Sequence, residues 1–293
     1  PPAPAPTATP AATTPAVAPS AAPVSSATST GPSDGPAAAS PAGPAMLPIL
    51  VSSELAPGPN RFLFSLSDRS NRLLAAPDVA VRLQFYADDV DPDAVAFEAD
   101  ARFLWAVEGV SGLYAADIEL PSAGRWGTRF NATFPDGSTQ TVRADYDILK
   151  APVTPAIGGP APAVDTPTAA DVGGDLTRVT TDPSPDPRLY EQSIADAIAR
   201  KAPFVVVFAT PAFCESATCG PTLETVKAVA AEHPDLTFIN VEPYLMELRD
   251  GRLQPVLDAS GQLQPAAWTE AWHLLTEPFI AVVDADGVVR AKF

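Results

Sequence analysis

The sequence is poor in cysteine, histidine, methionine and basic residues. Its 293 residues include two Cys, two His and two Met. Two cysteines separated by four residues are too few for a disulfide framework and fit a catalytic or redox pair better. Eighteen Lys and Arg against 35 Asp and Glu give a net charge of −17. This balance argues against binding to nucleic acid or anionic membranes, because phosphate contacts need clustered basic side chains.

Long apolar runs are also missing, and no stretch of the sequence approaches the roughly 18 residues of a membrane-spanning helix. Residues 1–46 consist almost entirely of Pro, Ala, Ser and Thr, with Asp34 as the one charge. Such a composition cannot offset the entropy lost on folding, so we expect a disordered tether there. A tether of this kind before folded domains resembles exported bacterial lipoproteins. The resemblance implies an extracytoplasmic protein that meets a membrane only through an N-terminal anchor outside this sequence.

Residues 47–150 alternate apolar and polar side chains, as strands with one buried face do. Alternating runs cover residues 79–85, 126–134 and 142–148, and Pro, Gly and Asp turn signals separate them. Short strands with turns at intervals of about 8–12 residues predict an all-β sandwich. The Leu-Pro-x-x-Gly-x-Trp motif at 120–126 resembles immunoglobulin-like domains attached to exported bacterial redox proteins. That resemblance implies a spacer or docking module.

A second domain is expected over residues 188–293, after a linker over residues 151–187 that contains eight prolines. Periodicity and apolar runs predict two helix–strand pairs, an irregular insertion, and then two strands. The predicted elements are a helix over 188–199, a strand over 204–208, a helix over 221–232, a strand over 236–241, and strands over 279–283 and 288–293 joined by an Asp-Gly turn.

This order of elements, with Cys214 and Cys219 between a buried strand and a helix, resembles the thioredoxin-like superfamily. The family's cis-proline matches Pro278, while its closing helix has no counterpart before the sequence stops at Phe293. The resemblance implies a thiol–disulfide oxidoreductase that acts on extracytoplasmic protein thiols or disulfides, together with a redox partner and without a cofactor or metal. It makes Cys214 and Cys219 catalytic, and it makes Glu277 and Pro278 binding residues for the substrate chain.

The sequence leaves open which cysteine attacks the substrate. Cys219-Gly-Pro is similar to the start of the family's Cys-Gly-Pro-Cys motif, whereas Cys214 lies at the family's distance from the preceding strand. We favour Cys214 as nucleophile and Cys219 as resolving thiol. Within regular helix, Cα atoms at i and i+5 would lie about 8–9 Å apart, beyond the limit of about 7 Å for a disulfide. Cys214 should therefore lie in the loop before the helix, unless the first helical turn unwinds.

Proton handling and two other functions also stay open. The strand before the cysteines has no acidic residue, so proton transfer is expected to fall to Glu215, Glu242 or water. A Cu(I) relay would use both thiolates and a third ligand from His273 or Met246. A non-enzymatic binding module would instead keep the pair as a structural disulfide. Negative charge from Glu215 and Glu277 would oppose thiolate formation.

Overall fold

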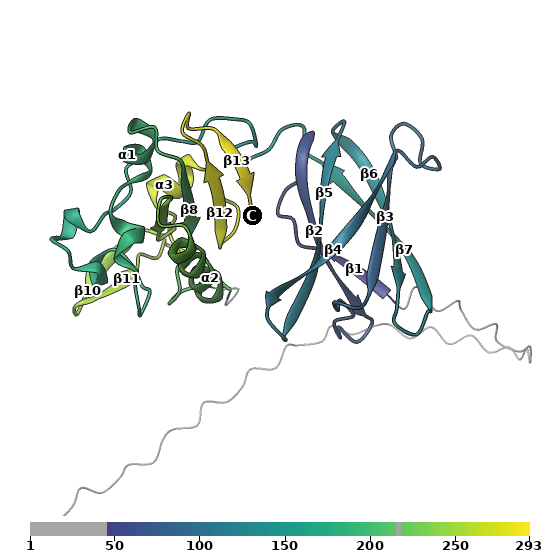
Figure 1. The fold of residues 1–293 in the computed structure, drawn as a ribbon, viewed down its shortest axis with the longest axis horizontal. Helices are drawn as coiled ribbons and strands as arrows, with labels where there is room; N and C mark the ends of the chain where they lie inside the picture. The colour runs from purple at the N-terminus through teal and green to yellow at the C-terminus, as the bar shows by residue number, and fades with distance from the viewer. Residues whose placement is uncertain (1–45, 215–217) are drawn as a thin grey trace, which may run out of the picture. The chain divides into compact units, whose positions relative to one another are not determined.

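The structure is a computed structural model that describes residues 46–214 and 218–293. The tether expected over residues 1–46 lies outside the described residues except for Met46, and Glu215 lies outside them as well. The described chain contains a large antiparallel sheet, called here the β region, followed in sequence by a smaller α/β region (Figure 1). None of the helices in the described residues is long and apolar enough to cross a membrane.

Seven antiparallel strands form the β region and confirm the predicted all-β fold class. They hydrogen-bond in the order β1-β2-β5-β4-β3-β6-β7. Their bounds are Met46–Leu50 (β1), Gly58–Asp68 (β2), Ala80–Ala87 (β3), Phe97–Val107 (β4), Ser111–Leu120 (β5), Gly124–Thr133 (β6) and Thr139–Ile148 (β7).

The strands make one continuous sheet, whereas a sandwich was expected to have two separate sheets. The reason is β4, which is long enough to pair twice. Its first half, Phe97 to Ala101, pairs with β3, and its second half, Arg102 to Val107, pairs with β5. The edge strands β1 and β7 also contact each other, so the sheet curls towards a barrel.

An aromatic core fills the inside of the curled sheet. Phe62 and Phe64 of β2, Phe85 of β3 and Phe130 of β6 are all buried. The Phe62 and Phe85 ring centroids lie 5.4 Å apart and the Phe64 and Phe130 centroids 4.9 Å apart, both edge-on, which is a favourable arrangement of aromatic rings. Burying each ring stabilises the fold by roughly 1.5–3 kcal/mol.

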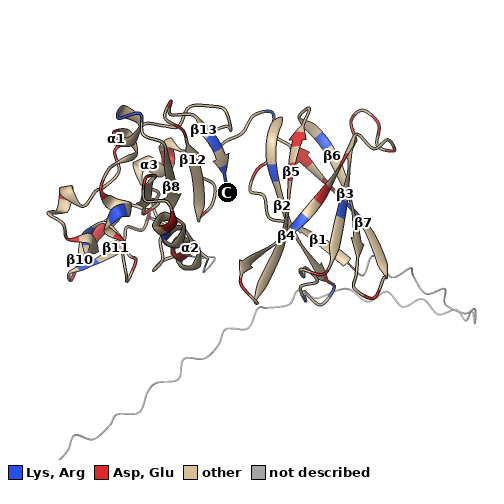
Figure 2. Cartoon of the chain, in the orientation of Figure 1, with Lys and Arg blue, Asp and Glu red and all other residues tan. Residues whose placement is uncertain are grey.

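Charged positions occur on β3 and β4 (Figure 2), and their side chains are exposed. Arg82 on β3 pairs with Glu98 on β4 at 2.6 Å, and both side chains are largely exposed.

The α/β region is built on a four-stranded sheet with the order β13-β12-β8-β9. Strands β8 and β9 are parallel, and β12 is antiparallel to β8. All four strands were predicted from the sequence. Their bounds are Phe204–Phe208 (β8), Thr237–Val241 (β9), Phe279–Val283 (β12) and Val289–Lys292 (β13), and the α-helices are Ile194–Ala199 (α1), Cys219–Glu232 (α2) and Ala267–Ala271 (α3).

Two local predictions differ from the structure. The helix expected over 188–199 is broken into a 3₁₀ turn, η3 (Pro187–Tyr190), and α1, because Ser193 and Asp196 form a capping box that starts a new helix. The insertion expected to be irregular holds a hairpin, β10 (Met246–Arg249) and β11 (Arg252–Pro255).

The proline-rich segment 151–187 is not a bare spacer, although its composition suggested one. It contains the 3₁₀ turns η1 (Ala170–Val172) and η2 (Leu176–Arg178). Residues 158–161 pair with residues 287–289, where the edge strand β13 begins. Ala161 and Val179 are buried in the hydrophobic clusters of the α/β region. This segment therefore belongs to the fold that holds the cysteines.

Candidate functional site

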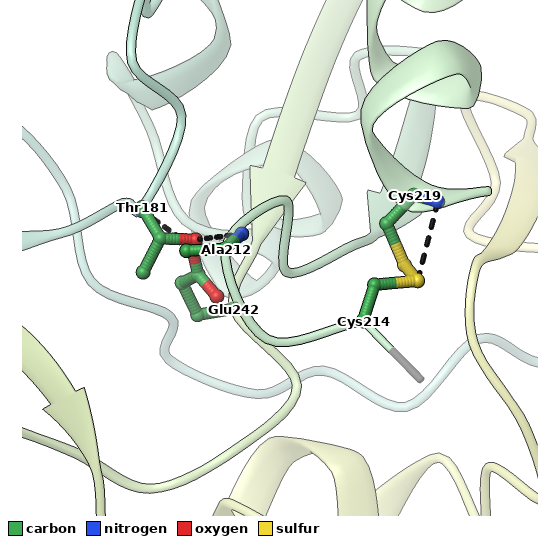
Figure 3. The surroundings of a disulfide bond; sticks show 5 residues. All are labelled: Thr181, Ala212, Cys214, Cys219 and Glu242. Carbon is green, nitrogen blue, oxygen red and sulfur yellow. Dashed lines mark hydrogen bonds between the residues drawn. A yellow bond between two sulfur atoms is a disulfide. The ribbon is translucent and has the colours of Figure 1, made fainter. Parts of the chain in front are cut away.

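The cysteine pair lies between the end of β8 and the start of α2 (Figure 3). Cys214 and Cys219 form a disulfide with their Cα atoms 6.0 Å apart. Cys219 is the first residue of α2, and Cys214 lies in the loop before it. The prediction that the pair cannot close inside regular helix is confirmed, because Cys214 stands outside the helix.

The two sulfurs have different surroundings. Cys219 has 0% exposed surface and packs in a cluster with Val207 and Leu223. Cys214 is half-buried, and its Sγ accepts a hydrogen bond from the backbone N–H of Cys219 at 3.2 Å. The first N–H groups of a helix have no partner inside the helix and carry the positive end of its dipole. After reduction, the same N–H would stabilise a thiolate at Cys214.

The sequence explains why α2 starts at this point. Pro221 lies in the first turn, where its missing N–H and fixed φ cost the helix nothing. Leu223, Val226 and Ala230 then repeat at helical spacing, and all three are buried. The apolar face anchors α2 over the sheet, and its N-terminus is thereby held beside the end of β8.

Glu277 and Pro278 lie directly before β12 and reach the cysteines from a different part of the chain. The Glu277–Pro278 bond is cis, as the sequence predicted. A carboxylate oxygen of Glu277 and the sulfurs of Cys214 and Cys219 all lie within 4.8 Å of one another. The carboxyl group expected beside the thiols therefore lies there, at Glu277. Thr218 joins Glu277 and Pro278 in lining one surface hollow.

Glu242 holds the loop that precedes Cys214. The residue follows β9 and is 5% exposed. Its Oε1 accepts hydrogen bonds from the backbone N–H of Thr181 at 2.5 Å and from Thr181 Oγ1 at 2.7 Å. Thr181 Oγ1 in turn accepts the N–H of Ala212 at 3.3 Å, as Figure 3 shows. Burial raises the pKa of the Glu242 carboxyl.

Proton transfer by Glu242 stays a prediction, since the hydrogen bonds of its carboxylate are with Thr180 and Thr181 and not with the sulfurs. Thr181 itself was missed by the sequence analysis. It stands in the proline-rich segment, and neither periodicity nor a motif marks it as the residue that ties this loop to Glu242.

The ligands expected for a Cu(I) relay lie elsewhere. His273 follows α3 with a φ of 50°. Within residues 46–214 and 218–293, His273 does not join the cluster of Cys214, Cys219 and Glu277. Met246 begins β10, in the separate two-stranded sheet. The third potential ligand next to the sulfurs is thus a carboxylate.

Comparison with protein-family models and with curated protein sequences finds no match for this chain. The functional proposal below accordingly depends on the sequence and on the geometry just described.

Proposed function

We propose that the protein is a thiol–disulfide oxidoreductase in which Cys214 is the attacking thiolate and Cys219 resolves the mixed disulfide. The observation that carries this proposal is the asymmetry of the pair. Cys214 is half-buried and accepts an N–H at the start of α2, whereas Cys219 is fully buried behind it. In this proposal a substrate sulfur reacts with Cys214, and the buried Cys219 reacts only within the molecule.

The arrangement of the α/β region supports a thioredoxin-like fold. The strand order β13-β12-β8-β9, with β8 and β9 parallel and β12 antiparallel, follows the order in which that family pairs its strands. The cysteine loop leaves the carboxyl end of the central strand β8 and enters α2, and Pro278 stands just before β12. In this proposal the β region is an immunoglobulin-like spacer or docking module.

The proposed reaction conserves electrons between protein and substrate. The Cys214 thiolate attacks one sulfur of a substrate disulfide, forming a mixed disulfide and releasing one substrate thiolate. The Cys219 thiolate then attacks Cys214 Sγ, which restores the Cys214–Cys219 bond and releases the second substrate thiolate. The protein loses two electrons and the substrate gains them, and a partner dithiol must reduce the protein again. The reverse sequence would oxidise a substrate dithiol.

The proposed substrates are proteins outside the cytoplasm. Stable disulfides form mainly in oxidising compartments, and the Pro/Ala/Ser/Thr composition of residues 1–46 is typical of a tether in an exported protein. Glu277, whose side chain lies at the cysteines, also stands before β12. There its backbone is placed to pair with an extended substrate segment, as the family resemblance implies.

Trapping of mixed disulfides tests the order of attack. Cys219→Ser should accumulate a mixed disulfide through Cys214 with a peptide or protein disulfide, detected by non-reducing electrophoresis and mass spectrometry. Cys214→Ser should accumulate none, and a Cys214→Ser/Cys219→Ser double variant is the background control. Trapping from Cys214→Ser alone would reverse the roles.

A structural disulfide without activity is the competing interpretation. The proposal expects the pair to open in a glutathione buffer and to accelerate insulin reduction by dithiothreitol. A pair that stays closed in reduced glutathione, together with no acceleration, would overturn the oxidoreductase proposal in favour of a binding module.

A further inference from the structure

We propose that the reduced protein binds one Zn²⁺ through the thiolates of Cys214 and Cys219 and the carboxylate of Glu277, and releases it when the disulfide forms. The inference rests on the proposed function only in requiring that the cysteine pair can be reduced. It adds a ligand and a regulatory state to the same three residues.

Geometry gives the first support. The Glu277 oxygen and both sulfurs already lie within 4.8 Å of one another while the disulfide is closed. In a tetrahedral zinc site, Zn–S bonds of about 2.3 Å and Zn–O bonds of about 2.0–2.2 Å place neighbouring ligand atoms roughly 3.5–4 Å apart. Once the S–S bond is broken, small side-chain movements are enough to seat the ion.

The ligands are also held by separate, ordered parts of the fold. Cys219 is fixed by α2 and by the hydrophobic cluster around it, and Glu277 is fixed by its place directly before β12. Cys214 and Glu277 are half-buried while Cys219 is buried. In zinc sites with three protein ligands, water takes the fourth coordination position, and the same is proposed for this ion.

Charge gives the second support. Reduction of the pair would place two thiolates beside a carboxylate, and such like charges at close range repel one another. A divalent cation between them removes most of that repulsion. In its absence, Glu277 favours protonated thiols.

The donor set selects the metal. Two thiolates with one carboxylate suit zinc, which accepts both sulfur and oxygen ligands. Cu(I) prefers soft ligands throughout, and the third group next to the sulfurs is the hard oxygen of Glu277. Calcium and magnesium bind through oxygen ligands alone, so the cysteine sulfurs exclude them.

The exchange between metal and disulfide balances as follows. The dithiol form binds Zn²⁺ with loss of two protons, giving a zinc dithiolate. A substrate disulfide then takes two electrons from the two cysteine sulfurs. The products are two substrate thiolates, the Cys214–Cys219 disulfide and free Zn²⁺. Bound zinc would therefore slow disulfide exchange by the reduced pair, and oxidation of the pair by a substrate disulfide would release the ion.

Metal titration of the full chain tests the proposal. The protein is reduced with a phosphine, freed of the phosphine without oxygen, and titrated with Co²⁺ as a spectroscopic probe and with Zn²⁺ against a chromophoric chelator. We expect one metal per chain, thiolate-to-cobalt charge-transfer absorption and tetrahedral d–d bands. The oxidised protein and Cys214→Ser should lose this binding, and Glu277→Gln should weaken it about 10-fold or more.

Glu270→Gln is the matched control, because Glu270 is an exposed carboxylate on α3 outside the cluster. Its affinity should equal that of the unmodified protein. Absence of thiolate-to-metal absorption, one metal shared by two chains, or unchanged affinity in Glu277→Gln would each overturn the zinc site.

The zinc site and the oxidoreductase can fail separately. Metal binding without mixed-disulfide trapping by Cys219→Ser would leave the zinc site and remove the proposed function. Mixed-disulfide trapping by Cys219→Ser without metal binding would support the proposed function and remove the zinc site.

Discussion

The β region and the α/β region bury different kinds of side chain. The β region closes over aromatic rings, and its buried polar residues include small hydroxyl side chains such as Ser65, which donates to the Gly112 carbonyl at 3.0 Å. The α/β region buries the charged residues Asp182 and Glu242. Apolar burial has no direction, whereas a buried charge is stable only with a partner in one geometry.

Buried polar atoms without a hydrogen-bond partner also distinguish the two regions. Within the described residues, Gln192 Oε1, Asn240 Oδ1 and Glu242 Oε2 are buried without a well-formed hydrogen bond. All three lie in the α/β region. Buried polar groups are normally paired, so each exception points to a position kept for a reason other than stability. The β region is therefore held mainly by apolar packing, whereas the α/β region also depends on directed polar contacts, including those of Glu242 with the segment before the cysteine loop.

The largest effect is expected from the aromatic core of the β region. Phe64→Ala should lower the free energy of unfolding by about 3–5 kcal/mol, because it leaves a cavity among packed rings. Denaturant unfolding measures this loss. Val90, 82% exposed, provides the control, since Val90→Ala should change stability by about 0.5 kcal/mol or less. At temperatures where Phe64→Ala is folded, its disulfide exchange rate should be unchanged, and a large loss of rate would contradict the division between the regions.

A second comparison sets a buried ion pair against an exposed one. Lys227 Nζ lies 3.0 Å from Asp182 Oδ2, with side chains only 12% and 2% exposed. Lys227→Met should destabilise the protein by about 3 kcal/mol, because it leaves the buried Asp182 carboxylate without its positively charged partner. Arg82→Met breaks the exposed pair with Glu98 and should cost at most about 1 kcal/mol. Urea unfolding measures both losses in the free energy of unfolding. Equal losses in the two variants would contradict a stabilising ion pair between Asp182 of segment 151–187 and Lys227 of α2.

The pH dependence of stability should reveal the buried carboxyl. Burial raises the pKa of Glu242 above its ordinary value of 4.5, so the folded protein keeps this proton to higher pH than the unfolded chain does. Stability should then fall as pH rises from about 4.5 until the folded carboxyl ionises, by at most about 1.4 kcal/mol per pH unit.

Glu242→Gln removes that titration and keeps an oxygen to accept the Thr181 bonds. Thermal unfolding should show the variant close to the unmodified protein at pH 4 and progressively more stable than it towards pH 8. If the stability of Glu242→Gln relative to the unmodified protein fell with rising pH, the raised pKa of Glu242 would be contradicted.

The smallest effect is expected at the anchor of the cysteine loop. Thr181→Val removes the hydroxyl that donates to Glu242 and accepts the Ala212 N–H, at a cost of about 1 kcal/mol. Hydrogen exchange at the Ala212 amide should rise, whereas amides of β3 should stay as they are. Faster exchange throughout the chain would indicate general destabilisation instead.

The sequence predicted the parts of the fold that local chemistry decides. Residues 204–208 are wholly apolar and β-branched or aromatic, so they form a buried strand whatever surrounds them. The β10–β11 hairpin was missed although Asp250-Gly251, with φ of 51° and 75°, is a two-residue hairpin turn. The flanking residues are mixed in polarity, and the turn signal stood without clear strands on either side.

The features that the sequence did not predict depend on contacts between residues far apart in the chain. The contact between Thr181 and Glu242 spans 61 residues, and that between Asp182 and Lys227 spans 45. Composition marked the proline-rich segment as a linker because proline and glycine report local backbone preference and carry no information on distant partners. The resemblance to a known family placed Glu277 near the cysteines, but only the structure shows its carboxylate within 4.8 Å of both sulfurs.

Residues 158–161 pair with residues 287–289, where β13, one of the two outer strands of its sheet, begins. An uncovered edge strand offers a row of N–H and C=O groups to which strands of other molecules add. Pro160 has no N–H to donate, so the covering segment itself makes a poor template for a further strand. At the start of β13 the backbone groups of Val289 are already bonded, because Val289 N–H donates to Gly159 and Val289 C=O accepts from Gly158. The segment therefore closes this part of the edge to strands of other molecules.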